Sequence, residues 1–170
     1  RENGEGAEEI KQDKYRFGSD WFPFKHQVNA WTTLTDKTGK SAVVTSGTGS
    51  GKTECFMVPI LNDLASEYLE SQEKLVGIRA LFIYPLNALI NSQRERLRAW
   101  TAGFDDGVRF CLYNGNTADK KHHDQAKYPN EILTRQNLRA EPSPIMVTNA
   151  TMLEYMLVRQ VDEPILRQSQ

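Results

Sequence analysis

Short apolar runs alternate with longer amphipathic stretches along most of the chain. The apolar runs are bounded by proline, glycine or small polar residues, which is typical of buried strands. This pattern predicts strands at residues 41–45, 79–84, 108–113 and 144–148.

The stretches between these runs carry apolar residues at the three- and four-residue spacing of one helix face. Helices are expected after residue 51, at residues 87–100 and, with a weaker pattern, near residues 131–139. Thr151 and Glu154 form a capping-box pattern that predicts the start of a last helix, running to about Arg159. Strands that alternate with helices favour an α/β fold with a mostly parallel sheet and helices on both faces.

Composition fits one globular domain in a chain of 170 residues, of which 39% are hydrophobic and 25% charged. Residues 1–20 predict a tail or linker before a domain at residues 21–170. The net charge of −1 offers no overall attraction to nucleic acid, so any such contact must come from local geometry. Cys55 and Cys111 lack metal-site spacing and are expected to be buried thiols of a cytoplasmic protein. No apolar run is long enough to span a membrane and no signal-peptide pattern opens the chain, so no membrane partner is expected.

Residues 46–53 read Ser-Gly-Thr-Gly-Ser-Gly-Lys-Thr and match the P-loop pattern, except that serine replaces the first glycine. The glycines let the backbone curl so that several N–H groups converge on a phosphate, and the start of the next helix adds positive charge. Lys52 is expected to reach the β- and γ-phosphates of ATP, and the Thr53 hydroxyl to bind Mg²⁺. These two are the candidate catalytic residues. The candidate nucleotide-binding residues of the loop are Ser46, Gly47, Thr48, Gly49, Ser50, Gly51, Lys52, Thr53 and Glu54.

A P-loop is shared by kinases, transporters and motors, but residues 45–54 resemble the first motif of superfamily 2 helicases of the DEAD/DEAH type. The segments Tyr-Pro-Leu-Asn-Ala-Leu and Met-Leu-Glu-Tyr-Met-Leu are similar to those of large YprA-like and Lhr-like bacterial helicases. Within these, the likeness extends to anti-phage defence helicases of the Druantia and DISARM type.

Three further segments resemble helicase motifs in the order the family has them. Residues 24–31 look like an adenine-reading element, which implies that Gln27 pairs with adenine through its amide. Residues 84–93 are similar to motif Ia, and residues 147–156 to motif Ib with Ala150 in place of the usual proline. A glycine turn after the third expected strand also resembles a backbone-contacting turn of the family. The implied nucleic-acid-binding residues are Pro85, Asn87, Ala88, Gln93, Asn114, Gly115, Thr148 and Asn149.

The resemblance implies the front part of a RecA-like lobe that binds ATP and Mg²⁺ and contacts nucleic acid, with DNA favoured over RNA. Its implied partners are a second RecA-like lobe of the same protein and other defence-system subunits. The family's hydrolytic Asp-Glu pair is expected beyond Gln170, so this chain alone is expected to be inactive. Two alternatives stay open: another class of P-loop NTPase, and a module that binds nucleotide or partners without catalysis.

Two polar segments carry no site in this interpretation. Asp162 and Glu163 continue a helical pattern instead of ending a strand, and a surface loop is expected there. His122, His123 and Asp124 are adjacent, and neighbouring helical side chains diverge by about 100°, so a solvated loop is expected instead of a metal site. Basic residues expected to be solvated are Arg94, Arg96, Arg98, Lys120 and Lys121.

Overall fold

The computed structural model describes residues 15, 18, 20–120 and 123–169. Most of the expected tail at residues 1–20 lies outside these residues. The chain divides into two compact units: residues 17–71, here called the P-loop unit, and residues 72–170 with residues 1–16, here called the sheet unit. In the part of the chain described, no helix is both long and apolar enough to cross a bilayer.

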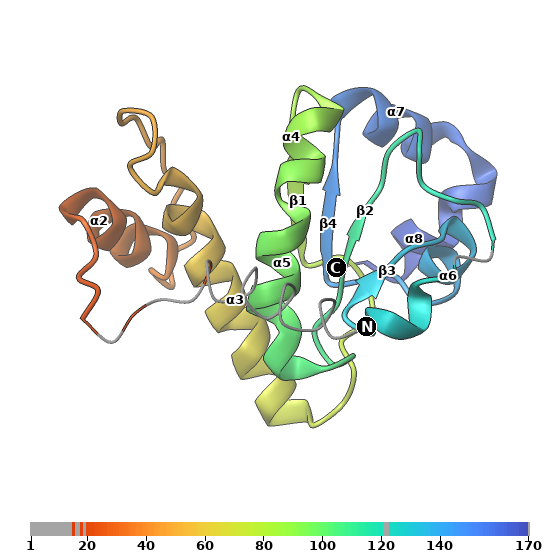
Figure 1. The fold of residues 1–170 in the computed structure, drawn as a ribbon, viewed down its shortest axis with the longest axis horizontal. Helices are drawn as coiled ribbons and strands as arrows, with labels where there is room; N and C mark the ends of the chain where they lie inside the picture. Colours follow the sequence, from red (N-terminus) through yellow and green to blue (C-terminus); the bar gives the residue numbers. More distant parts are fainter. Residues whose placement is uncertain (1–14, 16–17, 19, 121–122, 170) are drawn as a thin grey trace, which may run out of the picture. The chain divides into compact units, whose positions relative to one another are not determined.

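The sheet unit is built on four parallel strands (Figure 1). In chain order they are β1 (Ala80–Ile83), β2 (Phe110–Leu112), β3 (Glu131–Ile132) and β4 (Ile145–Thr148). Their order across the sheet is β1-β4-β2-β3, and each neighbouring pair is parallel. The expected parallel sheet is therefore confirmed, with three strands inside the ranges expected for them.

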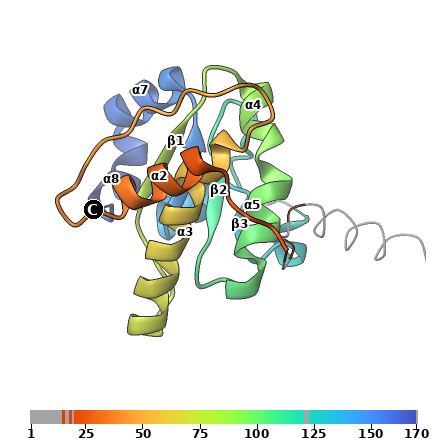
Figure 2. The same ribbon diagram turned by 90° about the vertical axis from the view of Figure 1, so that its left-hand side faces the viewer.

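Helices cover both faces of this sheet, as expected (Figure 2). One face carries α4 (Asn87–Ser92) and α5 (Arg94–Thr101). The other carries α6 (Arg135–Ala140), α7 (Ala150–Val158) and α8 (Glu163–Arg167). Short 3-10 turns complete the unit at η1 (Ala102–Phe104), η2 (Gln125–Lys127) and η3 (Gln160–Asp162).

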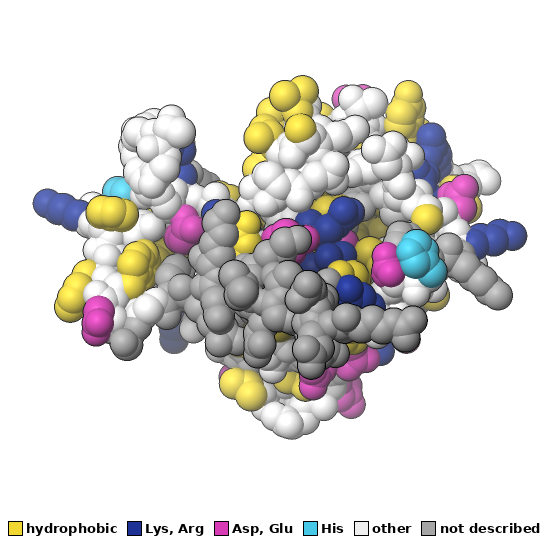
Figure 3. All heavy atoms as spheres, viewed as in Figure 1, with side chains coloured by type: hydrophobic (Ala, Val, Ile, Leu, Met, Phe, Trp, Pro, Cys, Tyr) yellow, Lys and Arg dark blue, Asp and Glu magenta, His cyan; other side chains and the backbone are white. Residues whose placement is uncertain are grey.

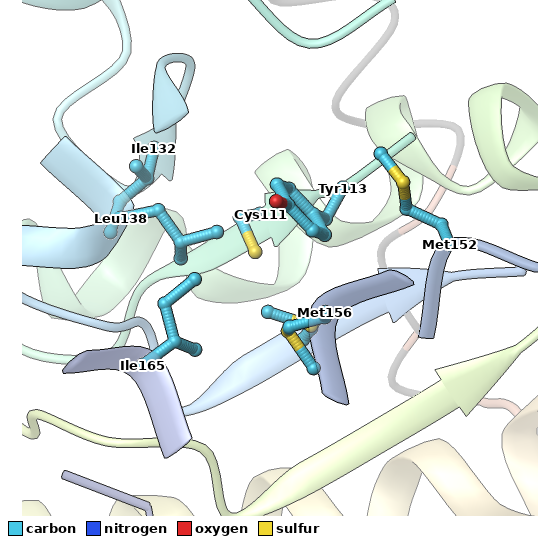
Figure 4. Close-up of a cluster of buried hydrophobic side chains, with 8 residues drawn as sticks. Cys111, Tyr113, Ile132, Leu138, Met152, Met156 and Ile165 are labelled. Carbon is cyan, nitrogen blue, oxygen red and sulfur yellow. The ribbon is translucent and has the colours of Figure 1, made fainter. Parts of the chain in front are cut away.

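A buried cluster joins the second face of the sheet to its helices (Figure 4). Side chains alternate between the faces of a strand, so Cys111 and Tyr113 of β2 and its extension point to the same side. There they meet Met146 of β4 and apolar side chains from α6, α7 and α8: Leu138, Met152, Met156 and Ile165. Both cysteines of the chain are free and buried, as expected.

Three expectations about element boundaries in the sheet unit were wrong. The helix expected at residues 87–100 is interrupted at Gln93, which separates α4 from α5. Residues 131–132 pair with β2 as strand β3, so the helix expected there begins only at Arg135. The last helix is capped by Asn149 and not by Thr151, because the Asn149 side chain accepts the Met152 N–H at 2.8 Å.

The P-loop unit consists of two packed helices, α2 (Lys25–Leu34) and α3 (Lys52–Ser71). The Trp31 indole N–H of α2 donates to the Glu54 carbonyl at the start of α3, at 2.9 Å. The strand expected at residues 41–45 was wrong: this segment belongs to no strand, and Val43 is 92% exposed. An apolar run becomes a strand only when a neighbouring strand satisfies its backbone, and residues 41–45 have no such neighbour among the residues described.

Candidate nucleotide and nucleic-acid sites

Residues 46–51 form a tight turn that leads directly into α3. Gly49 and Gly51 have φ of +76° and +73°, which non-glycine residues rarely adopt. A Cβ at Gly47 or Gly49 would meet no atom within 4 Å, so the outer side of the turn is open. The loop is therefore curled and accessible before the helix, as a phosphate cradle must be.

Internal hydrogen bonds fix the shape of this turn. The Lys52 ammonium donates to the Ser46 carbonyl at 3.0 Å and to the Gly47 carbonyl at 2.6 Å. The Ser50 hydroxyl donates to the Gly47 carbonyl at 2.7 Å, and its oxygen lies 2.5 Å from the Ser46 hydroxyl. Lys52 thus lies across the mouth of the turn, within reach of an anion that replaced these carbonyls as its partner.

Gln27 supports the turn from α2. Its side chain is 1% exposed, its amide nitrogen donates to the Gly51 carbonyl at 3.1 Å, and its oxygen accepts the Phe24 N–H at 2.8 Å. A Cβ at Gly51 would lie 2.3 Å from that nitrogen, so a side chain at residue 51 would displace Gln27. The histidine one position earlier, His26, makes a second contact with the turn, 2.9 Å from the Ser50 carbonyl. An adenine contact by Gln27 requires its amide to exchange one of its two bonds.

The remaining candidate residues follow at the first turn of α3. Thr53 is partly buried there, and Glu54 is the acidic residue of this turn. No group of three or more His, Cys, Asp or Glu side chains capable of holding a metal exists in the portion described. A hydroxyl next to a phosphate cradle suits Mg²⁺, which keeps several waters and takes phosphate oxygens as ligands. The residues present therefore fit a metal held jointly by Thr53 and a phosphate, and not one held by protein alone.

A groove of about 390 Å³ opens in the sheet unit, at the carboxyl edge of the sheet. It takes residues that directly follow β1 and β4, and Gly115 from the turn after β2. The carboxyl ends of parallel strands share one edge, where α/β sheets bind their ligands. Its lining is Pro85, Leu86, Asn87, Gly115, Asn149, Ala150, Thr151, Met152 and Tyr155.

The groove brings together four of the residues expected to bind nucleic acid. Asn149 donates its amide N–H to the Asn87 oxygen at 2.8 Å, which joins the loops after β4 and β1. Pro85 precedes this contact, and a Cβ at Gly115 would meet nothing within 4 Å. Gly115 thus presents bare backbone to the groove, as a close contact with a sugar-phosphate strand needs.

The other four expected residues lie elsewhere. Thr148 is fully buried, and its hydroxyl donates to the Tyr113 carbonyl at 2.6 Å. Asn114 lines a second cavity of about 320 Å³ together with Arg94 and Glu131. Ala88 is exposed on α4, and Gln93 lies at the break between α4 and α5 with its amide nitrogen bonded to Ser92 at 3.0 Å.

Residues that sequence reasoning missed complete the groove. Leu86 is 63% exposed and Tyr155 is 48% exposed, so both offer apolar surface beside the polar loops. Figure 3 shows hydrophobic side chains at the surface over the loop that joins β1 to α4. The spacing of Thr151 and Tyr155, four residues apart on one helix, was the signal that they share a face.

The expectation that Asp162 lies in a surface loop was wrong. Asp162 is fully buried in η3, where it accepts the Tyr113 hydroxyl at 3.0 Å and the Arg139 Nε–H at 2.8 Å. Burial, and then the bond to Asp162, raise the pKa of Tyr113, so its hydroxyl stays a donor at neutral pH. A carboxylate can be buried when such partners compensate its charge, and no local pattern reveals this pairing. Glu163 is exposed, as expected, but it begins helix α8 and does not lie in a loop.

Three of the basic residues expected to be solvated, Arg94, Arg96 and Arg98, are partly withdrawn from solvent. The guanidinium carbon of Arg96 lies 5.6 Å from the Tyr15 ring centroid and 5.8 Å from the Trp100 ring centroid. Arg94 and Arg98 bind the carboxylate of Glu131, which is 1% exposed, at 2.9 and 2.6 Å. His122 and Lys121 lie outside the described residues. His123 is exposed and pairs with Asp124 at 3.3 Å, so the expected solvated loop is confirmed for His123.

Comparison with known proteins assigns the chain to a protein family. The family model for the DEAD/DEAH box helicase matches residues 24–166, which is most of the chain. The chain therefore belongs to the DEAD/DEAH box helicase family, and the resemblance drawn from its motifs is confirmed.

Individual relatives agree with this assignment. The chain is 38% identical over 107 residues to the Druantia protein DruE of Escherichia coli (strain UMEA 4076-1), covering 56% of this chain and 6% of that protein. It is 40% identical over 140 residues to the ATP-dependent helicase MJ1574 of Methanocaldococcus jannaschii, covering 80% of this chain and 17% of that protein. The ATP-dependent helicase YprA of Bacillus subtilis is 25% identical over 115 residues, covering 68% of this chain and 14% of that protein.

The fold also matches a solved structure. The crystal structure of the helicase MrfA bound to DNA aligns with a TM-score of 0.62 and 21% identity, covering 94% of this chain and 20% of that one. This likeness supports the α/β helicase fold. The chain spans 6%, 14% and 17% of the three sequence relatives, a small part of each.

Proposed function

We propose that this chain is the nucleotide-binding front part of an ATP-dependent DNA helicase or translocase. The observation that carries the proposal is family membership over residues 24–166, joined to a curled P-loop turn before α3. The relatives are named ATP-dependent helicases, and MrfA was crystallised bound to DNA. Since one relative is a Druantia protein, we extend the proposal to anti-phage defence, with other defence subunits as partners.

Nucleotide binding rests on the turn at residues 46–51. Its N–H groups and the start of α3 would hold the phosphates of ATP, and Lys52 would exchange the carbonyls of Ser46 and Gly47 for phosphate oxygens. Thr53 would hold Mg²⁺, which neutralises charge on the phosphates when it is bound. Gln27 and Glu54 would steady the loop, and Gln27 would read adenine if it released Phe24.

Nucleic-acid binding rests on the groove at the carboxyl edge of the sheet. The linked side chains of Asn87 and Asn149, with the open backbone at Gly115, would contact the phosphates of a single strand. These contacts are uncharged, which is consistent with a net charge of −1. Uncharged contacts also suit a motor that must release the nucleic acid during each step of translocation. Apolar surface from Leu86 and Tyr155 would face the sugars and bases.

Two substitutions in the full-length protein test the two halves of this proposal. Lys52→Ala should abolish ATP hydrolysis while leaving thermal unfolding and DNA binding near wild type, because Lys52 contacts loop carbonyls and not the core. Gly115→Val should weaken binding of a single-stranded oligonucleotide about tenfold, the equivalent of one lost phosphate contact. The measurements are phosphate release and fluorescence anisotropy.

A matched control separates the groove from a general effect of a larger side chain. Gly103 also has open space around a built Cβ, but it lies in η1 and outside the groove. Gly103→Val should leave DNA affinity unchanged. Equal affinities for the Gly115 and Gly103 variants would refute the groove assignment, and normal ATP turnover in a folded Lys52→Ala protein would refute the nucleotide assignment.

A further inference from the structure

Asp162 is a fully buried acidic side chain, and the nucleotide chemistry does not use it. Its two oxygens bind groups from two other elements: the Tyr113 hydroxyl beyond β2, and Arg139 of α6. Burying an ion pair costs free energy of hydration, so such a pair is poor support for stability alone. A role in fixing positions explains it better.

The positions it fixes belong to the turn at residues 114–117, which begins immediately after Tyr113. The Tyr113 backbone is itself held on both sides, because its N–H donates to Val147 at 2.8 Å and its carbonyl accepts the Thr148 hydroxyl at 2.6 Å. With the ring hydroxyl bound to Asp162 as well, Tyr113 has no freedom to shift along the strand. The turn therefore starts from a fixed residue.

The second contact of Asp162 reaches the same turn through α6. Arg139 and Arg135 are four residues apart on this helix and share one face. Arg135 donates to the carbonyls of Asn114 and Thr117, each at 3.1 Å, and its guanidinium carbon lies 5.4 Å from the Tyr113 ring centroid. Asp162 thus holds the helix that grips both ends of the turn.

The turn also has its own internal bonds, which leave Gly115 at its tip. Asn116 N–H donates to the Asn114 side chain at 2.9 Å, and the Thr117 hydroxyl accepts the Asn114 N–H at 2.9 Å. Such a turn keeps its shape locally, but its placement relative to the groove depends on Tyr113 and Arg135. Asp162 in turn follows α7, whose first residues also line the groove.

We propose that Asp162 is a positioning residue for nucleic-acid binding, holding the 114–117 turn and the start of α7 at a fixed separation through Tyr113 and Arg139. The proposal rests on the assignment of the groove to nucleic acid. In this proposal Asp162 does not contact the nucleic acid. It determines the position of the Gly115 backbone relative to Asn149.

The test uses Tyr113→Phe in the full-length protein, which deletes one hydroxyl and keeps the buried ring. It should raise the concentration of single-stranded DNA that gives half-maximal stimulation of ATP hydrolysis, by about threefold to tenfold. This is the effect expected for one lost hydrogen bond. The rate at saturating DNA and the DNA-independent ATPase rate should stay unchanged. Backbone amide exchange in residues 112–118 should become faster. Asp162→Asn should act in the same direction, and the double variant should show less than the sum of the two effects.

Thr101→Val is the matched control, because it also deletes a buried hydroxyl but acts at the other end of β2. Thr101 accepts the Asn130 amide N–H at 2.8 Å, next to the residue that pairs with the start of β2. The proposal is overturned if Tyr113→Phe and Thr101→Val change the half-saturating DNA concentration and the amide exchange rates of residues 112–118 equally. Asp162 would then have only a structural role. If Gly115→Val weakens DNA binding while Tyr113→Phe does not, the positioning role alone fails. If neither variant changes DNA binding, the groove assignment fails as well.

Discussion

Gln27, Thr148 and Asp162 are polar side chains that the fold buries and satisfies with partners distant in sequence. Gln27 binds a carbonyl 24 positions away, Thr148 one 35 positions away, and Asp162 a hydroxyl 49 positions away. A local pattern can indicate that such a residue is polar, but not that a partner will arrive from another element. For this reason the motifs indicated Gln27 and Thr148 as ligand contacts and Asp162 as solvent-exposed, while the structure gives all three internal bonds.

Cys111 carries a prediction that depends on its burial. The thiol is 1% exposed, and burial raises its pKa to about 12. A thiol with a raised folded pKa contributes stability that is complete below the unfolded pKa of about 8.5 and is lost as pH rises toward the folded value. We expect the free energy of unfolding to fall from about pH 8.5 upward, and iodoacetamide to label Cys111 only in denaturant.

Peptide mass spectrometry after timed labelling measures the second effect, and denaturant melts across alkaline pH measure the first. Cys111→Ala is the control: it should be less stable at every pH but should show a smaller alkaline decline. Rapid labelling of Cys111 in the native protein would contradict its place in the core.

At the scale of elements, the strong periodic patterns located their elements and the boundaries depended on tertiary contacts. The runs before residues 84, 113 and 148 formed β1, β2 and β4, because each found a parallel neighbour. The run at residues 41–45 is also apolar at its centre, but it has no neighbouring strand among the residues described, so it formed no strand. Strand β3 is two residues long, and its Glu131 forms ion pairs with Arg94 and Arg98 of α5, contacts that a local pattern does not contain.

The cap of α7 gives a prediction at this scale. Asn149 accepts the Met152 N–H at 2.8 Å and also links α7 to Asn87. Asn149→Ala should lower the free energy of unfolding by about 1 kcal/mol, the usual cost of a lost N-cap. Thr151→Ala should cost less, because Thr151 lies inside the helix. Urea melts of the two variants decide the assignment, and a larger loss for Thr151→Ala would restore the capping box expected from sequence.

At the scale of the whole molecule, alternating patterns were sufficient for the parallel α/β class, since βα units leave few other arrangements. The strand order β1-β4-β2-β3 could not be predicted from these patterns, because it depends on which strands pair with one another in the folded chain. The groove could be anticipated in part: four of its residues were expected from motifs, and the geometry of the sheet edge added Leu86 and Tyr155.

The isolated chain of 170 residues should not be a working motor. Phosphoryl transfer needs a phosphate cradle, a held Mg²⁺, a positioned water and a charge-stabilising arginine. The turn at residues 46–51 and Thr53 would supply the first and part of the second. Asp162 is bound to Tyr113 and Arg139, so it is not available to hold a metal or orient water.

We therefore expect weak ATP binding and phosphate release at background level, with or without single-stranded DNA. The Asp162→Asn, Glu163→Gln double variant is the informative comparison, because these are the only adjacent acidic residues after β4 that could imitate the family's hydrolytic pair. Phosphate release that DNA stimulates in the wild-type chain and that the double variant loses, with its thermal melting retained, would show that this pair is catalytic. Background release in both chains would place the hydrolytic carboxylates outside these residues, and ATP turnover would then require the longer protein.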